Sequence, residues 1–280
     1  MEKGKSVLVC SLLLMLGSVS ACAVEENMQF EQDGETGTSE QSPHHFSATI
    51  GAYTDYLFRG LSFAKHGAVQ GTIDYTHDSG FYLGFGYSNV HKDAIYGNTY
   101  ETDYYTGFRK AFTDDFAVTV GLFNFTYPQK YKYVGQNSNV LEWLAMIDYK
   151  NFNIKYSQAL TDWFGYNTKS LGTATYRGKL VGHGSSKGTD YIEVNYTDKI
   201  PNTETSFHLH IGHQIVKNYS VANYTDMSVG VSRDFEFAGL KGWNAGLSYI
   251  MTNTKKDWYI DSSGDDLDRS RFFGYIRHTF

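Results

Sequence analysis

The chain has 280 residues, with 24 Lys and Arg, 30 Asp and Glu, and a formal net charge of −6. Six of the acidic residues lie between positions 24 and 45, where there is no Lys or Arg, so the rest of the chain is close to neutral. A chain without a basic excess is not expected to have nucleic acid as a partner. Aromatic residues make up 16% of the sequence, with 28 Gly and only 3 Pro, a composition typical of strands and turns.

Residues 1–23 have the pattern of an export signal. Two lysines precede an apolar run at 7–16, and small residues follow it. The run is too short to cross a bilayer as a helix. Cleavage after residue 23 is one prediction; cleavage before Cys22, which would then be lipidated, is the alternative, because residues 19–22 also fit a lipoprotein signal. The other cysteine, Cys10, lies inside the signal, so no disulfide is expected in the mature chain.

Residues 24–45 are predicted to form a disordered, acidic periplasmic tail. They are rich in Glu, Gln, Ser and Gly and hold few large apolar side chains, so burial cannot offset the entropy lost on ordering. The predicted organisation is therefore a signal at 1–23, a tail at 24–45 and one β domain at 46–280.

From residue 46 onward, apolar side chains recur at every second position. Phe81, Leu83 and Phe85, for example, alternate with Tyr82 and Gly84. A period of two is that of a strand with one apolar and one polar face. We predict twelve strands near residues 46–58, 67–76, 81–90, 99–112, 116–127, 139–149, 152–159, 189–199, 203–216, 223–235, 242–254 and 269–280.

The connections between these segments alternate in length. Short turns are expected at 77–80, 113–115, 150–151, 200–202 and 236–241, and mostly longer connections, including 160–188 and 255–268, lie between them. Short turns at one rim and long loops at the other are typical of bacterial outer-membrane barrels, which have an even number of strands. The predicted fold is an all-β, transmembrane, antiparallel up-and-down β-barrel with both termini periplasmic.

The last strand ends in an aromatic residue. Phe280 shares a face with Phe272 and Ile276, and His278 stands where an apolar residue is usual. A terminal Phe resembles the signal read by the machinery that inserts barrels into the outer membrane. Outer-membrane lipid and this machinery are therefore the expected partners.

Charged and polar groups occupy the face opposite the apolar one. Alternation alone would also fit a soluble barrel or sandwich, but a packed soluble core could not hold so many polar groups unpaired. We predict a constricted, partly ion-paired lumen, in which these groups either hold strands together or select solutes. The lumen-lining candidates are Asp55, Arg59, Asp74, Asp103, Arg109, Glu142, Lys155, Glu193, His208, His210 and Asp226.

Several segments carry a resemblance to a known family. Residues 54–60 have the sequence Thr-Asp-Tyr-Leu-Phe-Arg-Gly, residues 69–71 Val-Gln-Gly and residues 79–82 Ser-Gly-Phe-Tyr. Together with the acidic-aromatic strand at 101–107 and the segment 120–128, they resemble the TorF-type porin family of Gram-negative bacteria. The resemblance covers the first half of the chain best. It implies an outer-membrane barrel and implies nothing about the solute.

Three other functions are weaker alternatives. His208 and His210 lie two apart on one strand face and Asp226 could approach them, but two histidines do not make a metal site, so no metal and no cofactor are predicted. An outer-membrane hydrolase would need a catalytic group at the outer rim, for which Asp265 and Asp266 are the nearest candidates. A surface receptor or adhesin would use long loops such as 160–188.

The sequence therefore favours a narrow, porin-like channel for small solutes over an enzyme. Because acids outnumber bases on the inward face, we expect a modest conductance with at most a mild preference for cations.

Overall fold

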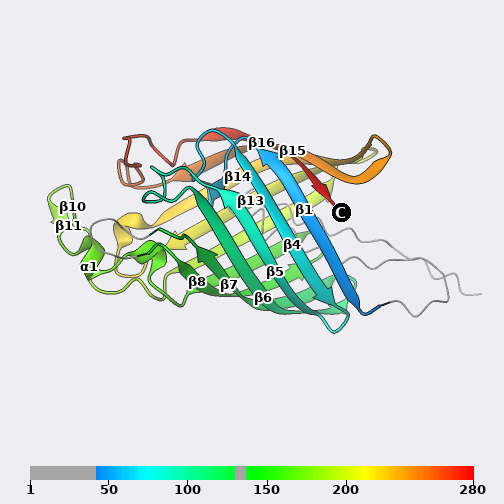
Figure 1. Ribbon diagram of the computed structural model, residues 1–280, viewed down its shortest axis with the longest axis horizontal. Coiled ribbons are helices and arrows are strands. Elements are labelled where there is room, and N and C mark those ends of the chain that lie inside the picture. The colour runs from blue at the N-terminus through cyan, green and yellow to red at the C-terminus, as the bar shows by residue number, and fades with distance from the viewer. Residues whose placement is uncertain (1–41, 130–136) are drawn as a thin grey trace, which may run out of the picture.

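The computed structural model describes residues 42–129 and 137–280, which form an all-β barrel (Figure 1). Each long strand pairs with the next one along the chain, and the first pairs with the last, with Ala52 opposite Ile276, so the sheet closes. The predicted closed antiparallel barrel of about twelve strands is confirmed. Its strands are β1 (His44–Tyr53), β4 (Ala68–His77), β5 (Phe81–Asn89), β6 (Tyr100–Thr113), β7 (Phe116–Thr126), β8 (Val140–Tyr149), β9 (Phe152–Ala159), β12 (Asp190–Lys199), β13 (Thr205–Ile215), β14 (Tyr224–Phe237), β15 (Leu240–Asn253) and β16 (Arg271–Thr279).

Smaller elements lie in the connections. No helix in the described part of the chain is long and apolar enough to cross a bilayer. These elements are the hairpin β2 (Leu57–Phe58) and β3 (Leu61–Ser62), the hairpin β10 (Thr175–Tyr176) and β11 (Lys179–Leu180), the 3-10 helices η2 (Trp163–Gly165) and η3 (Ser220–Ala222), and α1 (Thr168–Leu171).

The two rims differ in the length of their connections, as the sequence predicts. Tight turns join the strands at the short-turn rim, where both ends of the described chain also lie (Figure 1). The long-loop rim carries α1 and the β10–β11 hairpin (Figure 1). Between β14 and β15, Ala238 and Gly239 both have positive φ, 55° and 77°, which is the backbone of a two-residue hairpin turn. This turn is tighter than the predicted turn at 236–241.

Successive residues of each strand face opposite sides of the wall. Ile73 is 61% exposed and Leu247 is 52% exposed, whereas their neighbours Asp74 and Ser248 are buried. The outer face is therefore apolar, whereas the inner face carries the buried charged and polar groups together with aromatic side chains such as Phe123 and Phe125.

Tyrosines packed over glycines fill much of the inner wall. A Cβ atom on Gly84 would lie 2.3 Å from the ring of Tyr105 on the next strand. One on Gly212 would lie 2.0 Å from the Tyr191 hydroxyl. The glycines therefore give the tyrosine rings the space to lie flat against the wall, and this leaves their hydroxyls available to inward-facing acids.

The predicted strand at 46–58 is wrong beyond Tyr53. The wall strand β1 ends there, and the next residues turn into the barrel as the β2–β3 hairpin. Arg59 and Gly60 form its two-residue turn, with φ of 47° and 80°. Apolar residues continue through the bend, because they pack inside the barrel instead of facing outward. Asp55 and Arg59 consequently belong to an inserted segment and not to a wall strand.

The glycine and tyrosine packing predicts the effect of one added methyl group. Gly84→Ala should force the Tyr105 ring to move and lower the free energy of unfolding by about 1–3 kcal/mol. Gly274→Ala is the matched control, since its nearest neighbours would lie at an ordinary 3.7 Å. Denaturant unfolding of both variants in detergent or lipid measures the difference, and equal stabilities would contradict this packing.

Candidate functional site

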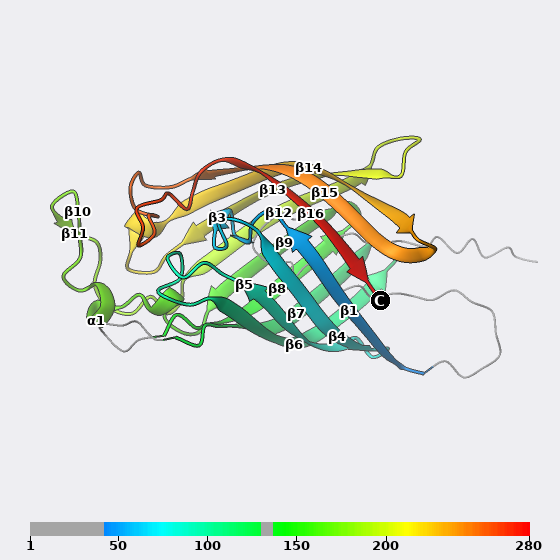
Figure 2. The same ribbon diagram turned by 45° about the horizontal axis from the view of Figure 1, so that its top comes forward.

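Residues 54–67, called here the plug segment, cross the interior near the long-loop rim (Figure 2). Tyr56, Leu57, Phe58 and Leu61 are at most 4% exposed. The segment leaves β1 and contacts strands around the barrel. Its contacts run from Tyr56 to Glu101 on β6, from Phe58 to Phe125 on β7, from Arg59 to Glu142 on β8 and Gln214 on β13, from Gly60 to Thr252 on β15, and from Asp55 to Arg271 on β16. The segment therefore spans the lumen.

An aromatic cluster holds the plug segment in place. The Phe58 ring stacks on Phe63 at 5.2 Å and meets the edges of Phe125 and Phe164 at 5.4 and 5.1 Å. Phe58 is completely buried. Burying one such side chain stabilises a fold by about 1.5–3 kcal/mol, so the segment is packed as part of the core.

At the tip of the plug segment, Arg59 lies in a socket made by three strands. Its guanidinium makes two bonds to Glu142, with Nη1 3.1 Å from Oε1 and Nη2 2.6 Å from Oε2. It also donates to Gln214 Oε1 at 2.8 Å. Its carbon Cζ lies 4.2 Å above the ring centre of Tyr191. Arg59 and Glu142 are at most 3% exposed, so this ion pair is shielded from water and its charges compensate each other.

A second charged group lies on the inner faces of β9, β12, β13 and β14. Lys155 Nζ lies 3.0 Å from Glu193, and His210 Nε2 lies 2.7 Å from Asp226. His210 Nδ1 is also 3.9 Å from Glu193, so the four side chains form one connected network. The predicted candidates Lys155, Glu193, His210 and Asp226 are thus brought together.

Acids on β4 and β6 have tyrosine partners. Tyr56 and Tyr127 both donate to Glu101, and Tyr105 donates to Asp74, which also accepts from Thr72 at 2.7 Å. The predicted candidate Asp103 lies on the same inner face of β6 and is 1% exposed. This side of the interior therefore concentrates carboxyl groups.

The remaining candidates lie nearer the short-turn rim. Arg109 pairs with Asp148, which also accepts from Asn153 at 2.7 Å. His208 contacts Ser232 at 2.7 Å and Thr197 at 3.1 Å.

His208 and His210 do not share a ligand site, because each contacts its own set of partners. Among residues 42–129 and 137–280, no three His, Cys, Asp or Glu side chains are grouped so that they could hold a metal ion. Cys22, the lipidation candidate, lies outside the described residues, as do the signal and most of the predicted tail.

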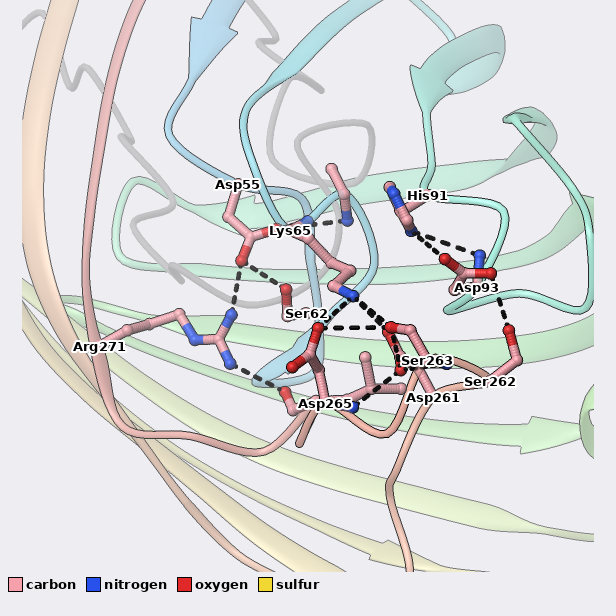
Figure 3. A network of polar contacts seen from close by, with 12 residues as sticks. Asp55, Ser62, Lys65, His91, Asp93, Asp261, Ser262, Ser263, Asp265 and Arg271 are labelled. Atoms are coloured by element: carbon pink, nitrogen blue, oxygen red, sulfur yellow. Dashed lines mark hydrogen bonds and ion pairs between the residues drawn. The ribbon is translucent and has the colours of Figure 1, made fainter.

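The long-loop rim holds the plug segment through a rim latch, defined here as Lys65 with Asp261 and Asp265 (Figure 3). Lys65 Nζ lies 2.5 Å from Asp261, 2.7 Å from Asp265 and 3.0 Å from Ser263 Oγ. The bond to Asp261, followed by that to Asp265, raises the pKa of Lys65. The bond from Lys65 lowers the pKa of Asp265. Burial alone would raise the pKa of Asp261, but hydrogen bonds from Lys65, Asp265 and Ser263 outweigh it and lower that pKa.

Other contacts join the plug segment to the connection after β15. Arg271 Nη1 lies 2.7 Å from Asp55 (Figure 3), and the Ser62 amide donates to the Leu267 carbonyl at 2.8 Å. Asp55 also accepts from the backbone amides of the segment itself, including Lys65 at 2.8 Å. The predicted candidate Asp55 therefore shapes the plug segment and anchors it to the wall.

The residues considered for hydrolysis serve as structural partners. Asp265 binds Lys65, and Asp266 lies 3.5 Å from Arg269. Nearby, Ser262 Oγ lies 2.8 Å from Asp93, while His91 is 3.6 Å from Asp93 (Figure 3). The serine thus contacts the acid and not the imidazole, so this arrangement lacks the base that a nucleophilic serine requires.

The connection at 160–188, considered as a receptor loop, is anchored to the neighbouring connection between β13 and β14. The Tyr219 hydroxyl donates to the Gly184 carbonyl at 2.7 Å, and Asn218 Nδ2 donates to the Ser185 carbonyl at 2.8 Å.

Several site residues were missed at the sequence level. Gln214 and Asp148 have the same inward parity as their predicted neighbours, so the period of two could have identified them. Tyr191 likewise shares the inward parity of Glu193 on β12, but a tyrosine was not among the charged groups from which the candidates were chosen. The sequence pattern did not identify Lys65, because its contacts depend on how the plug segment folds inside the barrel.

Comparison with known proteins identifies the family. Residues 37–280 match the family described as "Bacterial protein of unknown function (Gcw_chp)", and the chain belongs to this family. No curated protein matches the sequence. The family assignment supports a bacterial origin and leaves the porin activity implied by the TorF-type resemblance as a proposal.

Several solved porin structures have low similarity to this chain. The KdgM porin is 8% identical, with 84% of this chain and 99% of that chain covered and a TM-score of 0.46. The KdgM porin in complex with disordered oligogalacturonate has the same identity and coverage and a TM-score of 0.48. OccAB4 of Acinetobacter baumannii is 14% identical over 86% of this chain and 63% of that chain, with a TM-score of 0.41.

The shifted pKa values predict that the rim latch resists mild acid. Asp261 has a lowered pKa, so its contribution is complete above the ordinary Asp value of about 3.9 and is lost only as the pH falls through the lowered pKa. Lys65 has a raised pKa, so it stays charged up to and beyond its ordinary value of about 10.4. Hydrogen-exchange protection of the Ser62 amide should be equal at pH 5 and pH 8.

Lys65→Met should lower this protection at both pH values, because it leaves the two carboxylates without their cation. Lys255→Met, at an exposed lysine in the connection after β15, is the control and should change nothing. Loss of protection in the unmodified protein at pH 5 would show that other groups hold the segment.

Proposed function

We propose that this protein is an outer-membrane channel that passes small polar solutes through a narrow lumen, with the plug segment closing it in the form described. It has no catalytic role in this proposal. The observation that carries the proposal is the two-sided wall, which has an apolar outer belt and an ionic interior.

The outer belt has the layers expected of a protein in a bilayer. Aliphatic residues such as Ile73, Val229 and Leu247 face outward at mid-strand and are 48–61% exposed. Outward aromatic pairs lie toward both rims. Toward the short-turn rim they include Phe46–Tyr75, Phe152–Tyr196 and Phe235–Trp243, and toward the long-loop rim Tyr87–Tyr100, Trp143–Tyr156 and Tyr249–Phe272. Two aromatic girdles around an aliphatic band match the two interfaces and the hydrocarbon core of a membrane.

The interior supports passage of polar solutes and a mild cation preference. Inward-facing acids outnumber Lys and Arg, because Asp74, Glu101 and Asp103, together with the His210 partner Asp226, add to the acids that are paired with Arg or Lys. The acids are Asp55, Asp74, Glu101, Asp103, Glu142, Asp148, Glu193 and Asp226, and the bases are Arg59, Arg109, Lys155, Arg271 and Arg277. A lumen with this balance attracts cations.

The orientation in the membrane follows from the same layout. Short turns face the periplasm in bacterial barrels, so both chain ends would be periplasmic and the rim latch would face the outside. We expect the strand that ends in Phe280 to be recognised by the barrel-insertion machinery.

A charge on the outer belt tests the membrane location. Val229→Arg places a cation at mid-strand and should lower the free energy of unfolding in lipid by about 2–4 kcal/mol. Phe237→Arg, at the short-turn end of β14, is the control and should cost about 0–1 kcal/mol. Equilibrium unfolding in bilayers measures the loss of stability in both variants. Equal losses would contradict the placement of the outer belt in a membrane.

Conductance tests the channel itself. In planar bilayers, the purified protein should show small, intermittent currents with a reversal potential that favours cations. Asp74→Asn should reduce this preference, because it removes an ionisable carboxyl group while keeping an acceptor for Tyr105. Glu236→Gln, at an exposed acid near the end of β14, should leave the reversal potential unchanged. If neither the unmodified protein nor the Lys65→Met variant shows any current, conduction is excluded.

A further inference from the structure

The socket around Arg59 has the features of a binding site for a guanidinium group. Glu142 meets the two guanidinium nitrogens with its two oxygens, at 3.1 and 2.6 Å. Such paired bonds suit a planar guanidinium and not a compact ammonium. Gln214 supplies a third acceptor and Tyr191 an aromatic face.

Two of the three socket residues are held by groups other than Arg59. Gln214 Nε2 donates to the Asp190 carbonyl at 2.8 Å, and this bond keeps Oε1 directed at the guanidinium. The Tyr191 ring lies over Gly212, and its hydroxyl donates to Asp226 at 3.1 Å. Gln214 and Tyr191 should therefore keep their positions when Arg59 is absent.

The position of the socket fits a role in solute recognition. Tyr191 is the second residue of β12 and Gln214 is the second-last residue of β13, so both lie near the long-loop rim. A solute that enters from this rim would meet the socket before Lys155 and His210, which lie further along their strands from the rim. Arg59 lies on the plug segment, which enters the lumen from the same long-loop rim.

We propose that Glu142, Gln214 and Tyr191 form a binding site for small organic cations that carry a guanidinium group, and that Arg59 occupies it in the closed barrel as a tethered competitor. A guanidinium solute then competes with the plug segment for the same three side chains. This proposal rests on the proposed channel for its physiological meaning, but binding itself can be measured without any current.

Arg59→Ala removes the tethered group and tests the site directly. Ethylguanidinium, added at millimolar concentration and measured by calorimetry on the folded protein in detergent, should bind this variant at least tenfold more tightly than the unmodified protein, whose socket is filled. Ethylammonium at equal ionic strength should bind at least tenfold more weakly than ethylguanidinium, because it cannot make the paired bonds. Arg59→Ala with Glu142→Gln should lose the binding.

Arg59→Lys provides a second variant that keeps a positive charge in the socket. It should bind ethylguanidinium more tightly than the unmodified protein, because an ammonium makes fewer bonds to Glu142 and Gln214. In bilayers, ethylguanidinium should block the current of Arg59→Ala. Binding without any current would uphold the site and exclude the channel. Equal binding of the two cations, or binding that survives Glu142→Gln, would overturn the site.

Discussion

Closure of the sheet by β1 and β16 is the constraint on which the rest of the structure depends. Pairing the first strand with the last leaves no free edge, so the backbone groups of the wall find partners within the sheet. Closure also divides the side chains of each strand into one set outside and one set inside. An apolar exterior and an ionic interior can then coexist in a single layer of strands.

A barrel of twelve strands encloses more space than its own inward side chains fill, and the plug segment occupies part of it. The segment is held by two kinds of interaction. Phe58 packs in an aromatic cluster, while Arg59 makes a buried ion pair with Glu142. Removing either charge of such a pair leaves the other uncompensated, so the pair stabilises the fold only when both residues are present. The closed interior is therefore held specifically, and a channel function requires the segment to move.

Three residues along the plug segment hold it inside the barrel. Asp55 fixes the start of the segment to the wall through Arg271, Arg59 fills the socket in the lumen, and Lys65 fixes the end of the segment to the rim. The outer contacts are nearest to solvent, and the inner contact is the one that a solute of similar chemistry could replace. In the proposed channel, this order would link release at the rim to recognition in the lumen.

The sequence by itself determined the barrel, because a period of two depends only on local strand geometry and the surroundings of each face. It predicted twelve strands, the alternation of turns and loops, and the inward position of residues such as Glu142, Lys155 and His210. It did not predict that the chain leaves the wall after Tyr53, since Tyr56 and Phe58 continue the same apolar pattern. The pairing of Arg59 with Glu142 and of Lys65 with Asp261 was decided only by the tertiary structure, because closing the barrel brings together residues that lie 83 and 196 positions apart.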